Sequence, residues 1–273
     1  MMTQPVIICV APNGARKSKL DHPNLPITAS EIAYTAAECH ESGASMLHMH
    51  IRDDHGFHSL DADEYKRTIK KVRQAVGPDM IIQITTESVG KYSCDQQIDV
   101  VRKVRPEAVS IALRELCPSY SEEAKAGDFF HWMAKESISP QYILYNSEDV
   151  RRFDYLRQIG VIPGDHIAVL FVLGAYDPHI VANPADIRPM KDALTTDAVW
   201  SVCAFGRREL ECVVCAAKLG GHGRVGFENN LYKGTGERLL SNSSSVRLLK
   251  ESLEANGHKT ATSNMAQNLL NML

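Results

Sequence analysis

The stretch Ser45-Met-Leu-His-Met-His-Ile-Arg-Asp53 determines how the rest of the chain is interpreted. It is an apolar run that carries His48 and His50 two residues apart and ends in a charged Arg-Asp pair. In a β-strand, alternate side chains share a face, so His48, His50 and Arg52 are expected together on one side. Two neighbouring imidazoles on a strand can bind a divalent metal ion. The alternative is a pair of buried, hydrogen-bonded core histidines.

The composition is that of an ordinary globular protein. Of the 273 residues, 44% are hydrophobic and 23% charged, and the net charge of −3 gives no electrostatic argument for a nucleic acid or an anionic membrane as partner. No apolar run is long enough to span a bilayer, and the N-terminus lacks a signal-peptide pattern. We therefore expect a cytoplasmic protein whose seven cysteines are free thiols. Cys212 and Cys215 form one Cys-x-x-Cys without a second pair, which favours small buried residues on a helix over a zinc knuckle.

Apolar segments alternate with helical patterns along the whole chain. Helix starts are indicated by caps such as Thr28 with Glu31 three residues on. The expected strands are 6–11, 45–53, 80–87, 107–114, 141–146, 166–173, 198–205 and 220–228. The expected helices are 28–38, 61–76, 95–103, 121–135, 147–159, a short one within 184–197, 207–219 and 244–255.

Eight strands alternating with eight helices predict one (β/α)8 TIM barrel domain over residues 1–273. The alternative is an open, doubly wound parallel sheet. That fold is disfavoured because no Gly-x-Gly-x-x-Gly follows the first strand.

The active site of such a barrel lies at the C-terminal ends of the strands. Strand parity predicts these inward-facing residues there: Gln83, Thr85, Glu87, Ser110, Ala112, Arg114, His222, Arg224, Gly226 and Glu228. The last strand is separated from the His48 strand only by the first, so Glu228 is expected to join His48 and His50 around a metal. Two histidines and one carboxylate leave positions open for substrate, and the metal would act as a Lewis acid or a hydroxide source. The alternative for Glu228 is a salt bridge to Arg224.

Three arginines and five other histidines complete the list of candidates. If Arg16, Arg52 and Arg114 converge on the barrel mouth, they favour carboxylate or phosphate groups on the substrate; otherwise they are solvated loop charges. The remaining histidines in loops or helices are expected to be surface residues: His22, His40, His55, His58 and His131.

Five motifs occur in order along nearly the whole chain: Ala11-Pro-Asn-Gly-Ala15, His48-Met-His-Ile-Arg-Asp53, Thr85-Thr86, Pro106-Glu-Ala-Val-Ser110 and Gly220-Gly-His-Gly-Arg-Val-Gly-Phe-Glu-Asn-Asn230. Their order and spacing resemble the β-keto acid cleavage enzyme family. The resemblance implies a zinc-dependent barrel, usually a homotetramer, that converts a β-keto acid and acetyl-CoA into acetoacetate and a new acyl-CoA. In the implied chemistry, zinc binds the keto oxygen, the carbon between the carbonyls attacks acetyl-CoA, and a retro-Claisen step releases acetoacetate.

The resemblance also implies roles for individual residues. The zinc (Zn²⁺) ligands would be His48, His50 and Glu228. Arg224 would belong to the charged pair that serves the catalytic base. The substrate would be bound by Asn13, Arg16, Thr85, Thr86, Ser110 and Arg114, with the threonines and Ser110 at its carboxylate and keto end.

Two positions depart from the family member that cleaves an amino-bearing acid. Where that enzyme has an aspartate base after the zinc-binding glutamate, this chain has Asn229, whose amide cannot accept a proton at neutral pH. His222 is the candidate to take over that role. Where that enzyme has a glutamate for the substrate's ammonium group, this chain has Arg16, which should favour an anionic or neutral acid.

Two alternatives to this function remain open from the sequence. One is a metal-dependent hydrolase on the same fold, which acetyl-CoA dependence would distinguish. The other is a zinc-binding barrel without catalysis, in which Asn229 marks the loss of the base.

Overall fold

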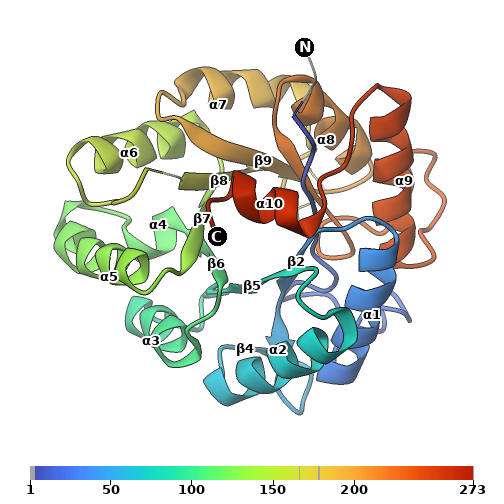
Figure 1. Ribbon diagram of the computed structural model, residues 1–273, viewed down its shortest axis with the longest axis horizontal. Helices are drawn as coiled ribbons and strands as arrows, with labels where there is room; N and C mark the ends of the chain where they lie inside the picture. Colours follow the sequence, from blue (N-terminus) through green and yellow to red (C-terminus); the bar gives the residue numbers. More distant parts are fainter. Residues whose placement is uncertain (1–3, 166, 178, 273) are drawn as a thin grey trace.

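The computed structural model describes residues 4–165, 167–177 and 179–272, and in these ranges eight parallel strands close into a barrel (Figure 1). The order around the barrel is β1-β10-β9-β8-β7-β6-β5-β2. These strands are β1 (Ile8–Val10), β2 (Met46–Met49), β5 (Ile81–Thr85), β6 (Ala108–Ala112), β7 (Ser139–Leu144), β8 (Ile167–Leu173), β9 (Ala198–Ala204) and β10 (His222–Val225). The predicted (β/α)8 barrel is confirmed. The expected start of β8 at His166 lies outside the described residues.

Helices surround the barrel, and Thr28 and Asp61 cap the first two as the sequence indicates. Thr28 and Glu31 form a reciprocal capping box, which satisfies backbone N–H groups that a helix start leaves free. The helices of the described residues are α1 (Ala29–Glu41), α2 (Ala62–Val76), α3 (Cys94–Val104), α4 (Leu113–Leu116), α5 (Glu123–Lys135), α6 (Ser147–Gln158), α7 (Ile187–Ala193), α8 (Glu209–Lys218), α9 (Asn242–Ala255) and α10 (Ser263–Leu269), with short 3-10 turns η1 (Tyr120–Glu122) and η2 (Pro184–Asp186).

The stretch with the two histidines is not one continuous strand. Strand β2 ends at Met49, and Ile51–Arg52 forms β3, which pairs antiparallel with β4 (His58–Ser59) in a hairpin outside the barrel. Gly56 has a positive φ of 80° and supplies the turn. The expected common face for His48, His50 and Arg52 was therefore wrong for Arg52.

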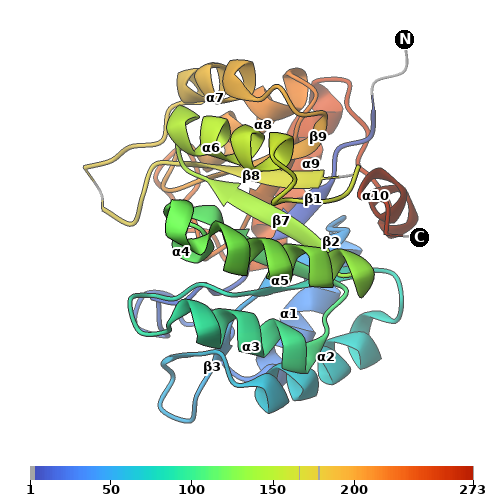
Figure 2. The same ribbon diagram turned by 90° about the vertical axis from the view of Figure 1, so that its left-hand side faces the viewer.

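Helix α10, which the sequence analysis did not predict, covers the end of the barrel where the strands begin (Figure 1). Its Ala266 and the following Leu270 pack with Ile7, Met46 and Ile81 from the strand starts. Figure 2 shows α10 on one side of the molecule and the loops that follow the strands on the other. The end with the strand C-termini therefore stays accessible for a site.

The helices contact the barrel through the principal hydrophobic core, whose members include Ile32, Val72, Phe153 and Leu249. All seven cysteines are free thiols, and Cys212 and Cys215 lie on α8. Within the described residues, no helix combines the length and apolar character needed to cross a bilayer.

Candidate metal centre and active site

His48, His50 and Glu228 come together at the C-terminal end of the barrel. The Nε2 atoms of the two histidines are 3.1 Å apart, and each lies 3.4 Å from Oε2 of Glu228. One ligand atom from each residue lies within 4.8 Å of the others, and all three side chains are buried. The predicted convergence of these three residues is thus present in the fold.

Both histidines are held by other residues. Nδ1 of His48 lies 2.8 Å from Oε1 of Gln83, so a proton on Nδ1 leaves the Nε2 lone pair facing the cluster. Asn13 bonds the backbone of His50 twice, through its amide nitrogen to the carbonyl (2.8 Å) and by accepting from the His50 N–H (3.2 Å). Burial lowers the pKa of His48 to about 3, which keeps it neutral, as a metal ligand must be.

Glu228 reaches the cluster from the loop after β10, and that loop is tightly anchored. Gly14 has a positive φ of 61°, and a Cβ there would lie 2.6 Å from Cγ of Glu228, so only glycine fits. Lys17 Nζ donates to the carbonyl of Glu228 (2.6 Å). The buried carboxyl group of Glu209, at the start of α8, accepts a hydrogen bond from the N–H of Gly226 (3.2 Å).

Arg224 pairs with Glu228 inside the barrel. Its NH2 group lies 3.2 Å from Oε1 of Glu228 and 3.4 Å from the sulfur of Cys203. Burial alone would raise the pKa of Glu228, but the charge of Arg224 counteracts burial and holds that pKa well below its ordinary value. The salt bridge considered as an alternative therefore exists together with the histidine contacts, because each carboxylate oxygen faces a different partner.

These donors suit a divalent cation. Oε2 of Glu228 is buried without a hydrogen-bond partner among the described residues, and it faces the histidine Nε2 atoms. A carboxylate and two neutral imidazoles are common donors for zinc and for other transition metals. Three protein ligands leave further coordination positions for substrate, which is typical of catalytic and not structural sites.

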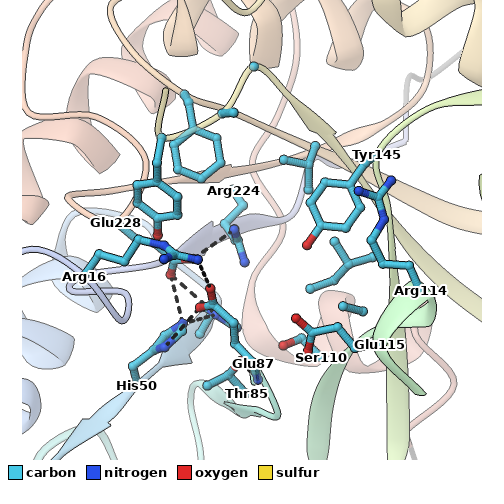
Figure 3. Close-up of a pocket in the computed structure, with 18 residues that line it drawn as sticks. Arg16, His50, Thr85, Glu87, Ser110, Arg114, Glu115, Tyr145, Arg224 and Glu228 are labelled. Atoms are coloured by element: carbon cyan, nitrogen blue, oxygen red, sulfur yellow. Dashed lines mark hydrogen bonds and ion pairs between the residues drawn. The ribbon is translucent and has the colours of Figure 1, made fainter. Parts of the chain in front are cut away.

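The cluster forms one wall of a cavity of about 280 Å³ (Figure 3). Two hydroxyl residues of β5 and β6, Thr85 and Ser110, line it, and the Ser110 hydroxyl is buried without a partner among the described residues. The lining includes Arg16, Glu87, Ala112, Arg114, Glu115, Ile143, Tyr145, Val172, Tyr176, Phe205 and Arg224.

The two arginines predicted to bind substrate lie in this wall, each paired with a carboxylate. Arg16 is half-exposed and contacts Glu87 (3.2 Å). Arg114 lies on α4, not on a strand, pairs with Asp149 (2.6 Å) and sits 4.0 Å from the centre of the Tyr145 ring. The positive charges of both arginines are therefore largely balanced by neighbouring carboxylates.

Three other residues predicted to belong to the site do not line the cavity. Arg52 donates to the carbonyls of Gly14, Lys17 and Gly56, so it ties loops together instead of lining the cavity. Asn13, as described, holds the His50 backbone. Thr86 turns away from the cavity, and its hydroxyl donates to the Ser110 carbonyl (3.1 Å).

The suggestion that His222 replaces the missing base does not fit the structure. His222 is the first residue of β10 and accepts from the N–H of Ile7, at the end of the barrel opposite to the cavity. Burial lowers its pKa to about 4. Asn229 is buried, is not part of the cavity lining, and has no hydrogen-bond partner for its side-chain amide within the described residues.

Two of the histidines expected on the surface are buried, namely His22 and His58. His58 packs against His50 with ring centres 5.1 Å apart, and its Nε2 contacts the Glu87 carbonyl (2.9 Å). Nothing in the spacing of a loop histidine marks such packing.

Several pocket residues had no role assigned from the sequence. Strand parity predicted that Glu87 faces inward with Thr85, and Glu87 does line the cavity, but nothing in the sequence suggested a role for it. Tyr145, Tyr176 and Phe205 follow the ends of β7, β8 and β9, where loops can close over a site. Outside the pocket, the role of Glu209 could not be predicted, because it is one of two acidic residues in the first turn of α8 and acidic residues are common there.

The fold and this site define a (β/α)8 barrel with a candidate metal centre at the C-terminal ends of its strands. The chain belongs to the beta-keto acid cleavage enzyme family, whose model matches residues 5–272, which confirms the resemblance. It is 28% identical to the 3-oxoadipate:acetyl-CoA acetyltransferase of Cupriavidus necator, over 99% of this chain and 96% of the relative. It is 27% identical to the 3-keto-5-aminohexanoate cleavage enzyme of Acetoanaerobium sticklandii, over 98% of each.

Solved structures support the fold. A ternary complex of ObcA with a C4-CoA adduct and oxalate has a TM-score of 0.71 and 16% identity, covering 91% of this chain and 68% of that one.

Proposed function

We propose that this protein is a zinc-dependent transferase that cleaves a β-keto acid with acetyl-CoA. The reaction converts R–CO–CH2–COO⁻ and acetyl-CoA into acetoacetate and R–CO–SCoA, so atoms balance without an oxidant or reductant. The proposal rests on the convergence of His48, His50 and Glu228 beside a cavity into which Ser110 brings a hydroxyl that has no partner among the described residues. The acetyl-CoA-dependent activities named for the relatives support it.

The chain's own residues supply binding and orientation. Thr85 and the unpartnered Ser110 hydroxyl offer hydrogen bonds to the carboxylate end of the acid. Arg224 lines the cavity and has buried Nε and NH1 groups without a partner in the described chain, which suit the same carboxylate. When bound by the cluster, zinc supplies Lewis acidity toward the keto oxygen.

A proton must leave the carbon between the two carbonyls before that carbon attacks acetyl-CoA. Asn229 cannot accept it. Glu228 is engaged by Arg224 and the histidines, which leaves Glu87 and Glu115 as the other cavity carboxylates. Glu115 is held by the Ser88 N–H and the Gln97 side chain, and Glu87 is held by Arg16. Each of these three carboxylates is therefore engaged, and we assign the proton to none of them.

The acid is proposed to be neutral or anionic at its distal end. Arg16 and Arg114 are each paired with a carboxylate, and neither offers an ammonium group the acceptor that a glutamate at position 16 would offer, while Ile143 and Val172 make part of the cavity wall apolar. An ammonium-bearing acid such as 3-keto-5-aminohexanoate should therefore be a poor substrate. Equal turnover of that acid and an uncharged one would contradict this assignment.

The test is mass spectrometry of the products. Zinc-loaded protein would be incubated with acetyl-CoA and a panel of neutral, anionic and amino-bearing β-keto acids. Acetoacetate with a matching new CoA thioester supports the proposal. Hydrolysis of an amide, ester or lactone without acetyl-CoA would instead establish a hydrolase. If zinc binds but nothing turns over, a non-catalytic role follows, and Asn229→Asp tests whether the missing carboxylate is responsible.

We also propose that the chain forms one domain, assembles as a homotetramer and is located in the cytoplasm. Size-exclusion chromatography with light scattering would measure the oligomeric state. The free cysteines suit the reducing cytoplasm.

A further inference from the structure

One ring nitrogen of His50 has no hydrogen-bond partner in the part of the chain that the structure describes. Its Nε2 faces the cluster, but its Nδ1 is buried and unpartnered among the described residues. His48 differs, because its Nδ1 contacts Gln83 at 2.8 Å. Histidines that bind metals nearly always donate their second ring N–H to an acceptor, which fixes the ring and raises its basicity.

Glu87 is the carboxylate that faces this nitrogen. Its Oε2 lies 3.8 Å from Nδ1 of His50, which is within ion-pair distance but longer than a hydrogen bond. The backbone of Glu87 is fixed on both sides, since its N–H donates to Thr85 Oγ1 (3.0 Å) and its carbonyl contacts Nε2 of His58 (2.9 Å). The position of Glu87 beside His50 is therefore set by the fold.

Arg16 holds the other oxygen of Glu87. Its NH2 group lies 3.2 Å from Oε1, and its guanidinium lies 4.8 Å from the centre of the Tyr176 ring. Figure 3 shows Arg16, Glu87 and His50 on the same side of the cavity, away from Arg114 and Glu115. The three residues thus form a line of contacts that ends at a candidate metal ligand.

We propose that Glu87 is the hydrogen-bond acceptor for His50 in the metal-bound protein, and that Arg16 positions Glu87 instead of contacting the substrate. This inference rests on the proposed metal site and gives Arg16 a different task from the substrate binding predicted from the sequence. Arg16 then contributes charge to the cavity wall while its guanidinium stays with Glu87.

The test measures Zn²⁺ affinity directly. Chelator-treated protein would compete for Zn²⁺ with a chromophoric chelator, for wild type, Glu87→Ala, Glu87→Gln, Arg16→Ala and the Arg16→Ala/Glu87→Ala double variant. Loss of such a partner typically weakens metal binding about 10- to 100-fold, so we expect that loss in Glu87→Ala. Glu87→Gln keeps an accepting oxygen and should recover much of the affinity. Arg16→Ala should weaken binding alone but add nothing in the double variant.

Kinetics separate positioning from substrate contact. With zinc saturating and a β-keto acid whose distal end is uncharged, Arg16→Ala should keep a KM close to that of wild type. Unchanged zinc affinity in Glu87→Ala, or a raised KM of Arg16→Ala for that uncharged acid at saturating zinc, would overturn the inference.

Glu115→Gln is the matched control for zinc affinity, because it alters a cavity carboxylate on the opposite side. It should bind zinc like wild type, and an equal loss there would also overturn the inference. Thermal unfolding of each variant confirms that it is folded. The proposed function fails separately if wild type does not bind zinc or if His48→Ala binds it equally well.

Discussion

The Nε2 atoms of His48 and His50 lie 3.1 Å apart in the mouth of the barrel, and both face the same oxygen of Glu228. With the His48 proton on Nδ1, toward Gln83, the Nε2 lone pair of His48 points at the cluster. A cation bound between these three atoms would replace the repulsion among their lone pairs with favourable coordination bonds.

We expect zinc to stabilise the folded protein through this cluster. At a free zinc concentration about 100 times the dissociation constant, a site that binds only the folded state adds about 2.7 kcal/mol to the free energy of unfolding. Thermal unfolding of chelator-treated protein, with and without added zinc, measures this gain. His48→Ala should abolish it, and a gain of the same size in that variant would place the metal elsewhere.

Gln83 should tune the site through His48. Gln83→Ala removes the acceptor 2.8 Å from Nδ1 and leaves the ring free to change orientation. Zinc affinity, measured by chelator competition, should fall about 10- to 100-fold. Gln158→Ala, at an exposed position on α6, is the control and should leave the affinity unchanged. Equal affinities for Gln83→Ala and wild type would count against this role.

Glu228 should be important for stability even without metal. Glu228→Ala leaves the buried Arg224 guanidinium without its carboxylate, and breaking a buried pair in this way typically costs about 3–5 kcal/mol. Urea unfolding of chelator-treated protein measures the loss. Adding Arg224→Met should recover part of it, since no charge is then left unpaired. Additive losses in the double variant would show that the pair is not coupled.

Glu209 should make the stability of the protein depend on pH. Burial raises its pKa from 4.5 to about 8, so between these values the folded protein holds a proton that the unfolded chain has released. The free energy of unfolding therefore falls as pH rises through this window, by on the order of a few kcal/mol. Glu209→Gln should flatten this dependence in urea unfolding at pH 5 to 8. Glu211→Gln, on the exposed side of the same helix, should not, and identical slopes for Glu209→Gln and wild type would refute the assignment.

Much of the fold follows from local signals. The alternation of apolar strands with capped helices predicts the barrel, because each βα unit has to bury its strand under its helix. Thr28 and Asp61 mark helix starts through short-range hydrogen bonds, so these boundaries can be predicted. Helix α10 is different, since it is stabilised mainly by the strand starts that it covers.

The site shows the same division. Strand parity correctly predicted that four residues face the interior of the barrel, because alternation along a strand is a local property. These residues are His48, Thr85, Ser110 and Arg224. It failed for Arg52, because β2 ends at Met49 and the chain enters a hairpin there. It also could not tell that His222, with the parity of Arg224, lies at the other end of the barrel.

By itself, the sequence determined the fold class and the family motifs, because these depend on periodicity and on spacing along the chain. It also predicted the three residues of the candidate metal centre, because the strand order of a closed barrel brings the last strand close to the one that carries His48. Only the tertiary structure decided which residues support the candidate metal ligands. Gln83 contacts the His48 ring, Asn13 binds the His50 backbone, and Glu209 anchors the loop that carries Glu228. These contacts join residues that lie 17 to 37 positions apart in the chain. Such pairings arise from strand register and barrel closure, which no local pattern encodes.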